Sequence, residues 1–266
     1  LLSNVRLKES KAYQDRLPTD GRNDFESDYG RVVFSPGVRR MHDKTQVFPL
    51  ISDDNIHTRL THSLEVSTIA YSLGINLCSN EEFKKKAKLE TENNLFRVIP
   101  TILKTVSLCH DIGNPPFGHY GEKVISDFFN DFLDCENAIN KEKVDSLNLS
   151  KEEIEDLINF DDNAQGFRVL SSLQTLQDPY GLNLTIASLS SYLKYTKLAG
   201  EELSDNNDKI GVFQTEKEKL LKIRDVTGLG TKKHPLAYLM EAADNICYLV
   251  MDIEDGYNKG YYKFDY

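Results

Sequence analysis

The adjacent residues His110 and Asp111 offer the clearest chemistry in this sequence. A neutral imidazole and a carboxylate form a mixed nitrogen and oxygen ligand set, which suits a divalent cation used in hydrolysis, such as Mn²⁺, Mg²⁺, Co²⁺, Ni²⁺ or Fe²⁺. Two side chains cannot hold such an ion alone. The pair therefore predicts a site for one divalent metal ion, to which distant parts of the chain contribute further ligands.

Two other segments carry candidate ligands among apolar residues. His62 lies in a segment whose apolar residues recur at helical spacing. Asp244 lies in an apolar helix that we expect to start at Pro235 and to stop at Gly256. A carboxylate among apolar neighbours is costly to bury unless it is paired or binds a metal. His62 and Asp244 are therefore candidates to complete a ligand set with His110 and Asp111.

A second polar pair, His119 and Glu122, follows a turn that contains Gly113 and two prolines. The two residues are three positions apart at the start of a predicted helix, so they share one face. A carboxylate that orients an imidazole is a common arrangement for general acid–base catalysis. An acidic residue is also favoured in the first turn of any helix by the helix dipole. The residue types alone leave both interpretations open.

Polar side chains also share helical faces with two of the predicted ligands. Arg59 precedes His62 by three positions, and a guanidinium group can bind a phosphate through two parallel hydrogen bonds. A surface ion pair is the more ordinary role for such an arginine. Tyr248 and Asp252 follow Asp244 at intervals of four, which places all three on one face of the last helix. His42 and His57 receive no assignment.

Helical periodicity dominates the elements that must position these side chains. The apolar residues from 98 to 108 predict a helix whose last turn carries His110 and Asp111. The helix that opens at His119 has an apolar stripe, which we predict to face the core. That stripe consists of Val124, Ile125, Phe128, Phe129 and Phe132. Strand signals are few, so we predict a mainly α fold with minor short β elements.

The rest of the chain divides into apolar and polar stretches. Residues 1–30 are polar and look like a loop, and residues 182–193 predict another helix. Polar excursions are expected near residues 135–150 and 200–232, and the second of these looks mobile. We treat residues 1–266 as a single domain, because 266 residues with 39% hydrophobic content can bury one sizeable core.

Composition excludes several functional classes. The chain contains no long apolar run that could cross a membrane, and its first residues lack the features of a secretory signal. The net charge of −10 argues against broad nucleic-acid binding. The sequence also has no glycine-rich phosphate-binding motif. No cysteine pair has CxxC spacing, so we expect reduced thiols in a cytoplasmic protein. The four cysteines are Cys78, Cys109, Cys135 and Cys247.

Four blocks of sequence, in order, resemble the bacterial deoxyguanosine triphosphate triphosphohydrolases, which are HD-domain enzymes related to the vertebrate SAM/HD-domain dNTPase. The blocks cover residues 39–47, 58–62, 110–119 and 241–246, and the resemblance extends over about residues 22–256. It implies an HD-type helical core and assigns the H…HD…D metal signature to the four ligands above. It further implies catalytic roles for His119 and Glu122. The implied substrate-binding residues are Gln46, Arg59, Asn114, Tyr248 and Asp252.

The resemblance implies a metal-dependent hydrolase that cleaves dGTP or another dNTP to deoxynucleoside and inorganic triphosphate. It also implies a homo-oligomer, an allosteric nucleotide and a chain that continues beyond residue 266. Two alternatives stay open: an HD phosphohydrolase for a monophosphate, a cyclic nucleotide or guanosine tetraphosphate, and a dNTP-binding regulatory subunit with little turnover. Relatives usually read Glu-Gly-Asn-Ala-Gln where this chain has residues 161–165, so Asp161 and Asp162 depart from the pattern.

Overall fold

The computed structural model describes residues 1–8, 21–47, 57–134, 144–173, 179–202, 209–261 and 263. The helices before the central motif are α1 (Asp24–Val33), α2 (Pro36–Arg40), the 3-10 turn η2 (Met41–Asp43), α3 (Arg59–Cys78), α4 (Glu81–Ala87) and α5 (Leu95–Leu108). Those after it are α6 (His119–Leu133), α8 (Lys151–Ile158), α9 (Asp162–Arg168) with a π-helical extension η3 (Val169–Leu173), α10 (Ile186–Tyr192), the 3-10 turn η4 (Gln214–Glu216), α11 (Lys217–Thr227) and α12 (Pro235–Asn258). Between described residues β structure is limited to isolated bridges, so the predicted mainly α fold is confirmed.

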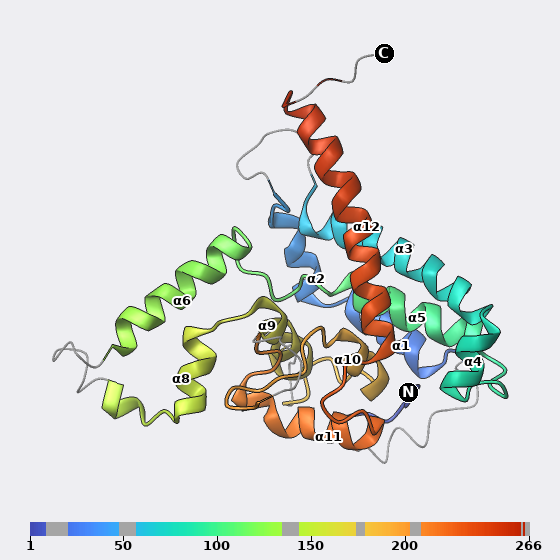
Figure 1. Cartoon of the computed structure of the whole chain (residues 1–266), viewed down its shortest axis with the longest axis horizontal. Coiled ribbons are helices and arrows are strands. Elements are labelled where there is room, and N and C mark those ends of the chain that lie inside the picture. The colour runs from blue at the N-terminus through green and yellow to red at the C-terminus, as the bar shows by residue number, and fades with distance from the viewer. Residues whose placement is uncertain are drawn as a thin grey trace.

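Helix α5 lies at the centre of the core, packed by α1, α3, α10 and α12 (Figure 1). Its apolar side chains Ile99, Ile102 and Leu103 are fully buried. The tightest approach is to α3, where a Cβ atom on Gly74 would lie only 2.9 Å from the Cα atom of Pro100. The two helices therefore hold each other in a fixed position, which in turn fixes the residues that precede and follow them.

The long helix α12 crosses this core and carries its distal half away from it (Figure 1). Its first turn is capped by His234, whose Nδ1 atom accepts hydrogen bonds from the backbone N–H of Leu236 at 3.2 Å and from the hydroxyl group of Ser191 at 3.1 Å. Pro235 starts the helix as predicted. The helix ends at Asn258, two residues beyond the predicted stop at Gly256. None of the described helices is long and apolar enough to cross a membrane.

Helix α6 projects away from α5 together with α8, its main contact among the described helices (Figure 1). The predicted core position of its apolar stripe is wrong, because Val124 is 49% and Phe128 is 59% exposed. Helical spacing shows which side chains share a face but not which element covers that face. In the described part of the chain, the other stripe residues, Ile125, Phe129 and Phe132, are half-buried and lie outside the main core cluster.

Three other predictions are corrected. Residues 24–33 form α1, with a complete capping box at Asn23, so the predicted loop at 1–30 is wrong there. The predicted mobile excursion at 200–232 contains α11, which buries Leu220 and Ile223 against the core. Helix α5 ends at Leu108, so His110 and Asp111 lie in the turn that follows the helix. Cys135 and parts of both predicted excursions (135–143 and 203–208) lie outside the described residues.

Candidate active site

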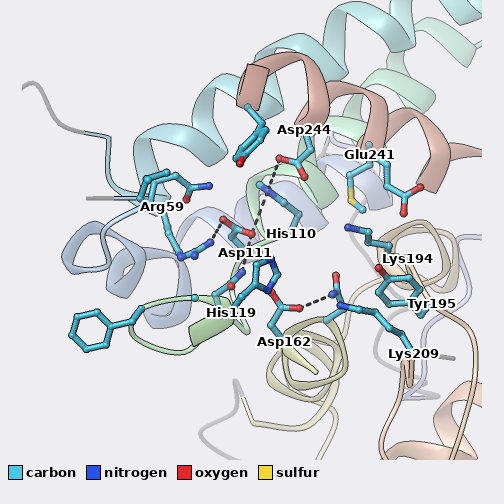
Figure 2. A pocket seen from close by; sticks show the side chains of 18 of the residues that line it. Arg59, His110, Asp111, His119, Asp162, Lys194, Tyr195, Lys209, Glu241 and Asp244 are labelled. Atoms are coloured by element: carbon cyan, nitrogen blue, oxygen red, sulfur yellow. Dashed lines mark hydrogen bonds and ion pairs between the residues drawn. The ribbon is translucent and has the colours of Figure 1, made fainter. Parts of the chain in front are cut away.

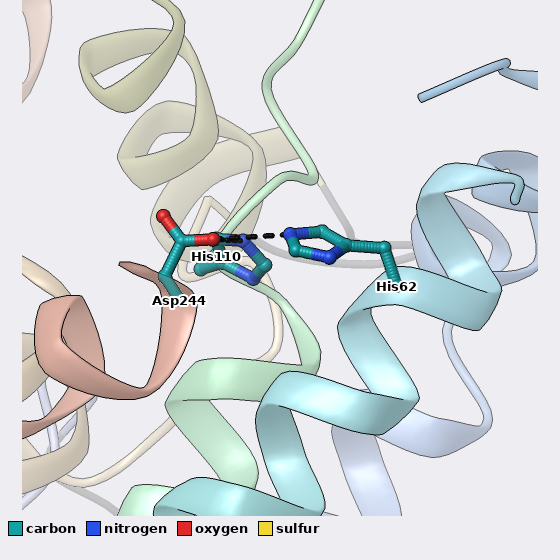
Figure 3. Close-up of side chains that lie close together, drawn as sticks. All are labelled: His62, His110 and Asp244. Atoms are coloured by element: carbon teal, nitrogen blue, oxygen red, sulfur yellow. Dashed lines mark hydrogen bonds and ion pairs between the residues drawn. The ribbon is translucent and has the colours of Figure 1, made fainter. Parts of the chain in front are cut away.

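Three of the predicted metal ligands meet where α3, α12 and the turn after α5 come together (Figure 3). The Oδ1 atom of Asp244 lies 3.0 Å from Nε2 of His62 and 3.4 Å from Nε2 of His110. His62 is almost fully buried. The ligand atoms of these three residues all lie within 4.8 Å of one another. Tertiary packing thus brings together side chains that are far apart in the sequence.

Asp111 borders this cluster and is bound from its other side. Its Oδ1 atom lies 3.4 Å from Nε2 of His110 and accepts a hydrogen bond from the side-chain amide of Asn114 at 2.9 Å. Its Oδ2 atom accepts a hydrogen bond from Arg59 at 2.6 Å. The side chains of Arg59 and Asn114 therefore orient the Asp111 carboxylate toward the cluster.

The tautomer of His110 is fixed by its surroundings. Its Nδ1 atom lies 2.7 Å from the carbonyl oxygen of Ser107, which can only accept, so Nδ1 carries the proton. Nε2 is left facing the carboxylates of Asp111 and Asp244, and it is buried without a hydrogen-bond partner. Burial alone would lower the pKa of His110, but the two carboxylates raise it to about 9.

The same surroundings lower the pKa values of the two carboxyl groups, Asp111 and Asp244. Burial disfavours the charged form of Asp244, yet the adjacent imidazoles of His110 and His62 hold its pKa well below the usual range. Burial also disfavours the charged form of Asp111. The positive charges of His110 and Arg59 outweigh this effect, so the pKa of Asp111 is lowered. Both groups are therefore anionic at neutral pH, as metal ligands must be.

His119 and Glu122 form the predicted pair at the start of α6. The Nδ1 atom of His119 lies 2.5 Å from Oε2 of Glu122, while the imidazole is 85% exposed on the open side of the site. The Oε1 atom of Glu122 accepts a hydrogen bond from the backbone N–H of Asp162 at 2.8 Å. Burial would raise the pKa of Glu122, but the hydrogen bonds from His119 and Asp162 lower it. The carboxylate is thus held between two helices.

Two glycines of the central motif allow this arrangement. A Cβ atom on Gly113 would lie 2.0 Å from the carbonyl oxygen of Asp162, so only glycine lets the first turn of α9 approach the motif. Gly118 has a φ of +54°, and a Cβ atom there would lie 2.7 Å from the guanidinium group of Arg59. The turn therefore passes Arg59 closely and delivers His119 to the site.

A cavity of about 430 Å³ lies in front of these groups (Figure 2). It brings together most of the predicted site residues: Gln46, Arg59, His110, Asp111, Asn114, His119, Asp244 and Tyr248. Asp252 does not line the cavity, but its hydrogen bond to Tyr248 is the main cause of a raised Tyr248 pKa. His62 and Glu122 do not line the cavity. His62 contacts Asp244 and Glu122 contacts His119, so each supports a residue that does line it.

Known proteins match most of this chain in sequence. The HD domain model matches residues 59–160, which run from Arg59 through the central motif. A Listeria innocua protein named deoxyguanosinetriphosphate triphosphohydrolase-like protein is 42% identical over 98% of this chain and 56% of its own length. A Klebsiella pneumoniae protein named deoxyguanosinetriphosphate triphosphohydrolase is 36% identical over 88% of this chain and 50% of its own length. Residues 59–160 of this chain therefore belong to the HD-domain family. The chain spans about half the length of the curated relatives it matches.

The residues present in this HD domain fit a divalent cation. Two imidazoles and two carboxylates form a donor set that suits Mn²⁺, Mg²⁺ or Fe²⁺. The decisive observation is Nε2 of His110, a buried nitrogen with no hydrogen-bond partner that faces two carboxylate oxygens. Ser107, Asn114 and Arg59 bind the other atoms of these ligands, which is the support that metal-binding side chains commonly have.

Sequence reasoning missed several polar residues that line the cavity. Lys194 and Lys209 line the cavity on the side opposite Arg59, with Tyr195 between them (Figure 2). Both ammonium groups lie near the Tyr195 ring, at 5.7 and 5.5 Å from its centroid. Glu241 and Asp162 complete this wall. No local pattern marks these residues, because lysines and acidic residues are common on surfaces and only tertiary contacts bring these together.

Proposed function

We propose that this HD domain is the catalytic unit of a metal-dependent dNTP triphosphohydrolase, which converts a dNTP and water to deoxynucleoside and inorganic triphosphate. The observation that carries the proposal is the meeting of His62, His110 and Asp244 beside a cavity with cationic groups on both sides. The names of the relatives support this substrate and this reaction. We propose that the described parts of residues 1–266 form one HD-type unit.

The four predicted ligands His62, His110, Asp111 and Asp244 would hold one divalent cation, Mn²⁺ or Mg²⁺ in our proposal. Such a cation supplies Lewis-acid chemistry, because it polarises a phosphate oxygen and acidifies water. Arg59 already binds Asp111 through one side of its guanidinium group, so its remaining donors are available to the phosphates. Lys194 and Lys209 would bind the far end of the triphosphate.

His119 would transfer the proton of the reaction, either to the 5′ oxygen of the leaving deoxynucleoside or from the attacking water. Its Nδ1 atom is occupied by Glu122, which leaves Nε2 for the substrate. Glu122 would stabilise the imidazolium form, since its own carboxylate is held by the backbone of Asp162. The pair thus has the hydrogen-bond geometry that proton transfer requires.

Gln46 and Tyr248 would bind the deoxyribose, with Asp252 orienting the Tyr248 hydroxyl group. A ring stacked close to the sugar leaves little room for a 2′-hydroxyl group, which would favour dNTPs over ribonucleotides. Asn114 would act through Asp111, because its side-chain amide is already bound there. A homo-oligomer, an allosteric nucleotide and a cytoplasmic location remain further proposals. The buried free thiols of Cys78, Cys109 and Cys247 are consistent with a reducing compartment.

Product identification tests the reaction directly. The protein is incubated with each of the four dNTPs in the presence of Mn²⁺ or Mg²⁺, and the products are separated by ion-exchange chromatography. We expect inorganic triphosphate and deoxynucleoside in equal amounts. Release of dNDP, dNMP or pyrophosphate would show that the reaction is a different one. Turnover of a cyclic nucleotide, a monophosphate or guanosine tetraphosphate with no turnover of dNTPs would favour a different HD phosphohydrolase, and binding without turnover would favour a regulatory role.

A further inference from the structure

Asp162 places a carboxyl group in the same cavity as His119. It is the first residue of α9 and is only 9% exposed. Its Oδ1 atom accepts a hydrogen bond from the side-chain amide of Asn163 at 2.6 Å, and its backbone N–H is bound to Glu122. The side chain is therefore fixed, and it faces the cavity and not the bulk solvent.

The groups around Asp162 are mostly acidic. Carboxylate oxygens of Glu122, Asp161 and Asp162 lie within 4.8 Å of one another. Lys209 lies on the same wall but pairs with Oδ2 of Asp161, at 3.3 Å. The His119 imidazole on α6 is also nearby, and Asp111 adds a further negative charge from the turn after α5. Among the described residues, none forms an ion pair with Asp162 itself.

So many carboxylates cannot all be ionised cheaply in a small buried volume. Burial, together with the charges of Glu122, Asp161 and Asp111, raises the pKa of Asp162 to about 7, and His119 opposes this effect. A protonated carboxyl group can donate a hydrogen bond, whereas an ionised one can only accept. Near neutral pH, the Asp162 carboxyl group is therefore present both in a protonated form, which can donate a hydrogen bond, and in an ionised form, which cannot.

We propose that Asp162 is a specificity-determining residue that binds the phosphate chain of a nucleoside polyphosphate as a hydrogen-bond donor and repels that chain when ionised. The inference rests on the proposed function, in which phosphates occupy the cavity between Arg59 and the two lysines. Binding of the substrate then takes up one proton from the solvent onto the Asp162 carboxyl group. An ionised Asp162 would instead place one more negative charge beside an anion.

The proposal predicts how substrate affinity depends on pH. If only the protonated form binds well, the KM for dGTP rises by up to about tenfold for each pH unit above 7. Asn at this position keeps a hydrogen-bond donor of similar shape but cannot ionise. The Asp162→Asn variant should therefore keep a KM that is nearly constant over this range.

The test measures KM and kcat for dGTP with saturating Mn²⁺ from pH 6 to 8.5. It compares the wild type, Asp162→Asn and the control Asp127→Asn, which removes an exposed carboxylate from the outside of α6. The ionisation of dGTP is common to all three proteins. We expect a flat KM profile for Asp162→Asn and the wild-type profile for Asp127→Asn. Parallel KM profiles for Asp162→Asn and the wild type would overturn the proposal, as would a flat profile for the wild type.

A binding measurement tests the proposal without turnover. Inorganic triphosphate is titrated calorimetrically into the Mn²⁺-loaded protein at pH 7.5, in two buffers that differ in ionisation enthalpy. The wild type should take up about half a proton or more beyond the uptake of Asp162→Asn. Equal uptake would overturn the proposal. If Asp162→Asn does not fold, Asp162→Gly replaces it, and it should lose the pH dependence and show a higher KM at low pH.

The failure of this inference and the failure of the proposed function have different signatures. If the wild type and Asp162→Asn both release triphosphate from dGTP with the same pH dependence of KM, only the role of Asp162 is refuted. If the wild type releases triphosphate from no dNTP, the proposed function is refuted. Proton uptake on binding inorganic triphosphate would then still report on Asp162.

Discussion

The groups proposed to bind the metal and the group proposed to move the proton are supported by different parts of the molecule. His62 and Asp244 lie on α3 and α12, and His110 follows α5, three helices that pack on one another around fully buried side chains. His119 opens α6, whose outer residues are exposed and whose main described contact is α8. The metal ligands are thus part of the core, whereas the proton-transfer group lies at the base of an arm.

Among the residues that the structure describes, few contacts join the two regions. The hydrogen bond from Asp162 to Glu122 is one, and the close approach of α9 to Gly113 is another. The turn between the regions has positive φ angles at Phe117 and Gly118, which is a strained conformation for phenylalanine. The difference teaches that ligand geometry follows from core packing, while the position of His119 depends on a small number of polar contacts. Substitutions in the two regions should therefore have separable effects.

The largest effect is expected for Asp111→Ala. This change removes a proposed ligand and leaves Arg59 buried without the carboxylate that it binds. Turnover should fall by more than about a thousandfold, because both the metal and the phosphate-binding arginine are affected. Triphosphate release and metal content by mass spectrometry measure the two losses. Full activity in this variant would refute the assignment of Asp111.

A smaller effect on turnover, with no effect on the metal, is expected for His119→Ala. Loss of a general acid or base lowers kcat by about 10²- to 10⁴-fold. The imidazole is 85% exposed and contacts no proposed ligand, so metal content and the unfolding temperature should stay close to wild type. A loss of bound metal in this variant would show that the two regions are not separable.

The free energy of unfolding should also be more sensitive to substitutions in the core than to substitutions on α6. Leu103 is fully buried between α5 and its neighbours, so Leu103→Ala should lower the free energy of unfolding by about 2–5 kcal/mol. Phe128 is 59% exposed on α6, so Phe128→Ala should cost less than about 1 kcal/mol. Urea denaturation of the two variants measures both values. Similar losses in both would mean that the α6 stripe is covered in solution.

The last predicted effect concerns pH and the core region. Burial lowers the pKa of His234, the cap of α12, to about 4. Between about pH 6.5 and 4 the unfolded chain binds a proton that the folded one does not, so this histidine's contribution is complete above pH 6.5 and is lost as the pH falls toward 4. The loss amounts to at most roughly 3 kcal/mol. His234→Gln should unfold with a shallower pH dependence than wild type in this range, and an identical dependence would contradict the assignment.

The sequence predicted the core helices well because their apolar residues recur at helical spacing, which is typical of a helix that buries one face. It misplaced the end of α5, since nothing between Leu108 and Gly113 breaks a helix by its own propensity. It also placed the α6 stripe in the core, because periodicity gives a face without its partner. The core was therefore predictable where one helix packs against several others, and not where a helix leaves them.

The candidate site was predictable to a similar degree. His62, His110 and Asp244 stand out because such residues are uncommon in or directly after apolar helices, and the structure brings them together. Lys194 and Lys209 did not stand out, because lysine is an ordinary surface residue and only the fold turns these two toward the cavity. The role of Asp162 depends on three carboxyl groups from two helices, which no single stretch of sequence reveals.

The central claim is that side chains from α3, α12 and the turn after α5 bind one divalent cation together. Titration of the metal-free protein with Mn²⁺, followed by electron paramagnetic resonance, tests it most directly. We predict one bound Mn²⁺ per chain in the wild type and at least about a hundredfold weaker binding in Asp244→Ala, with Asp127→Asn unchanged. One ion bound to Asp244→Ala with wild-type affinity would contradict the account.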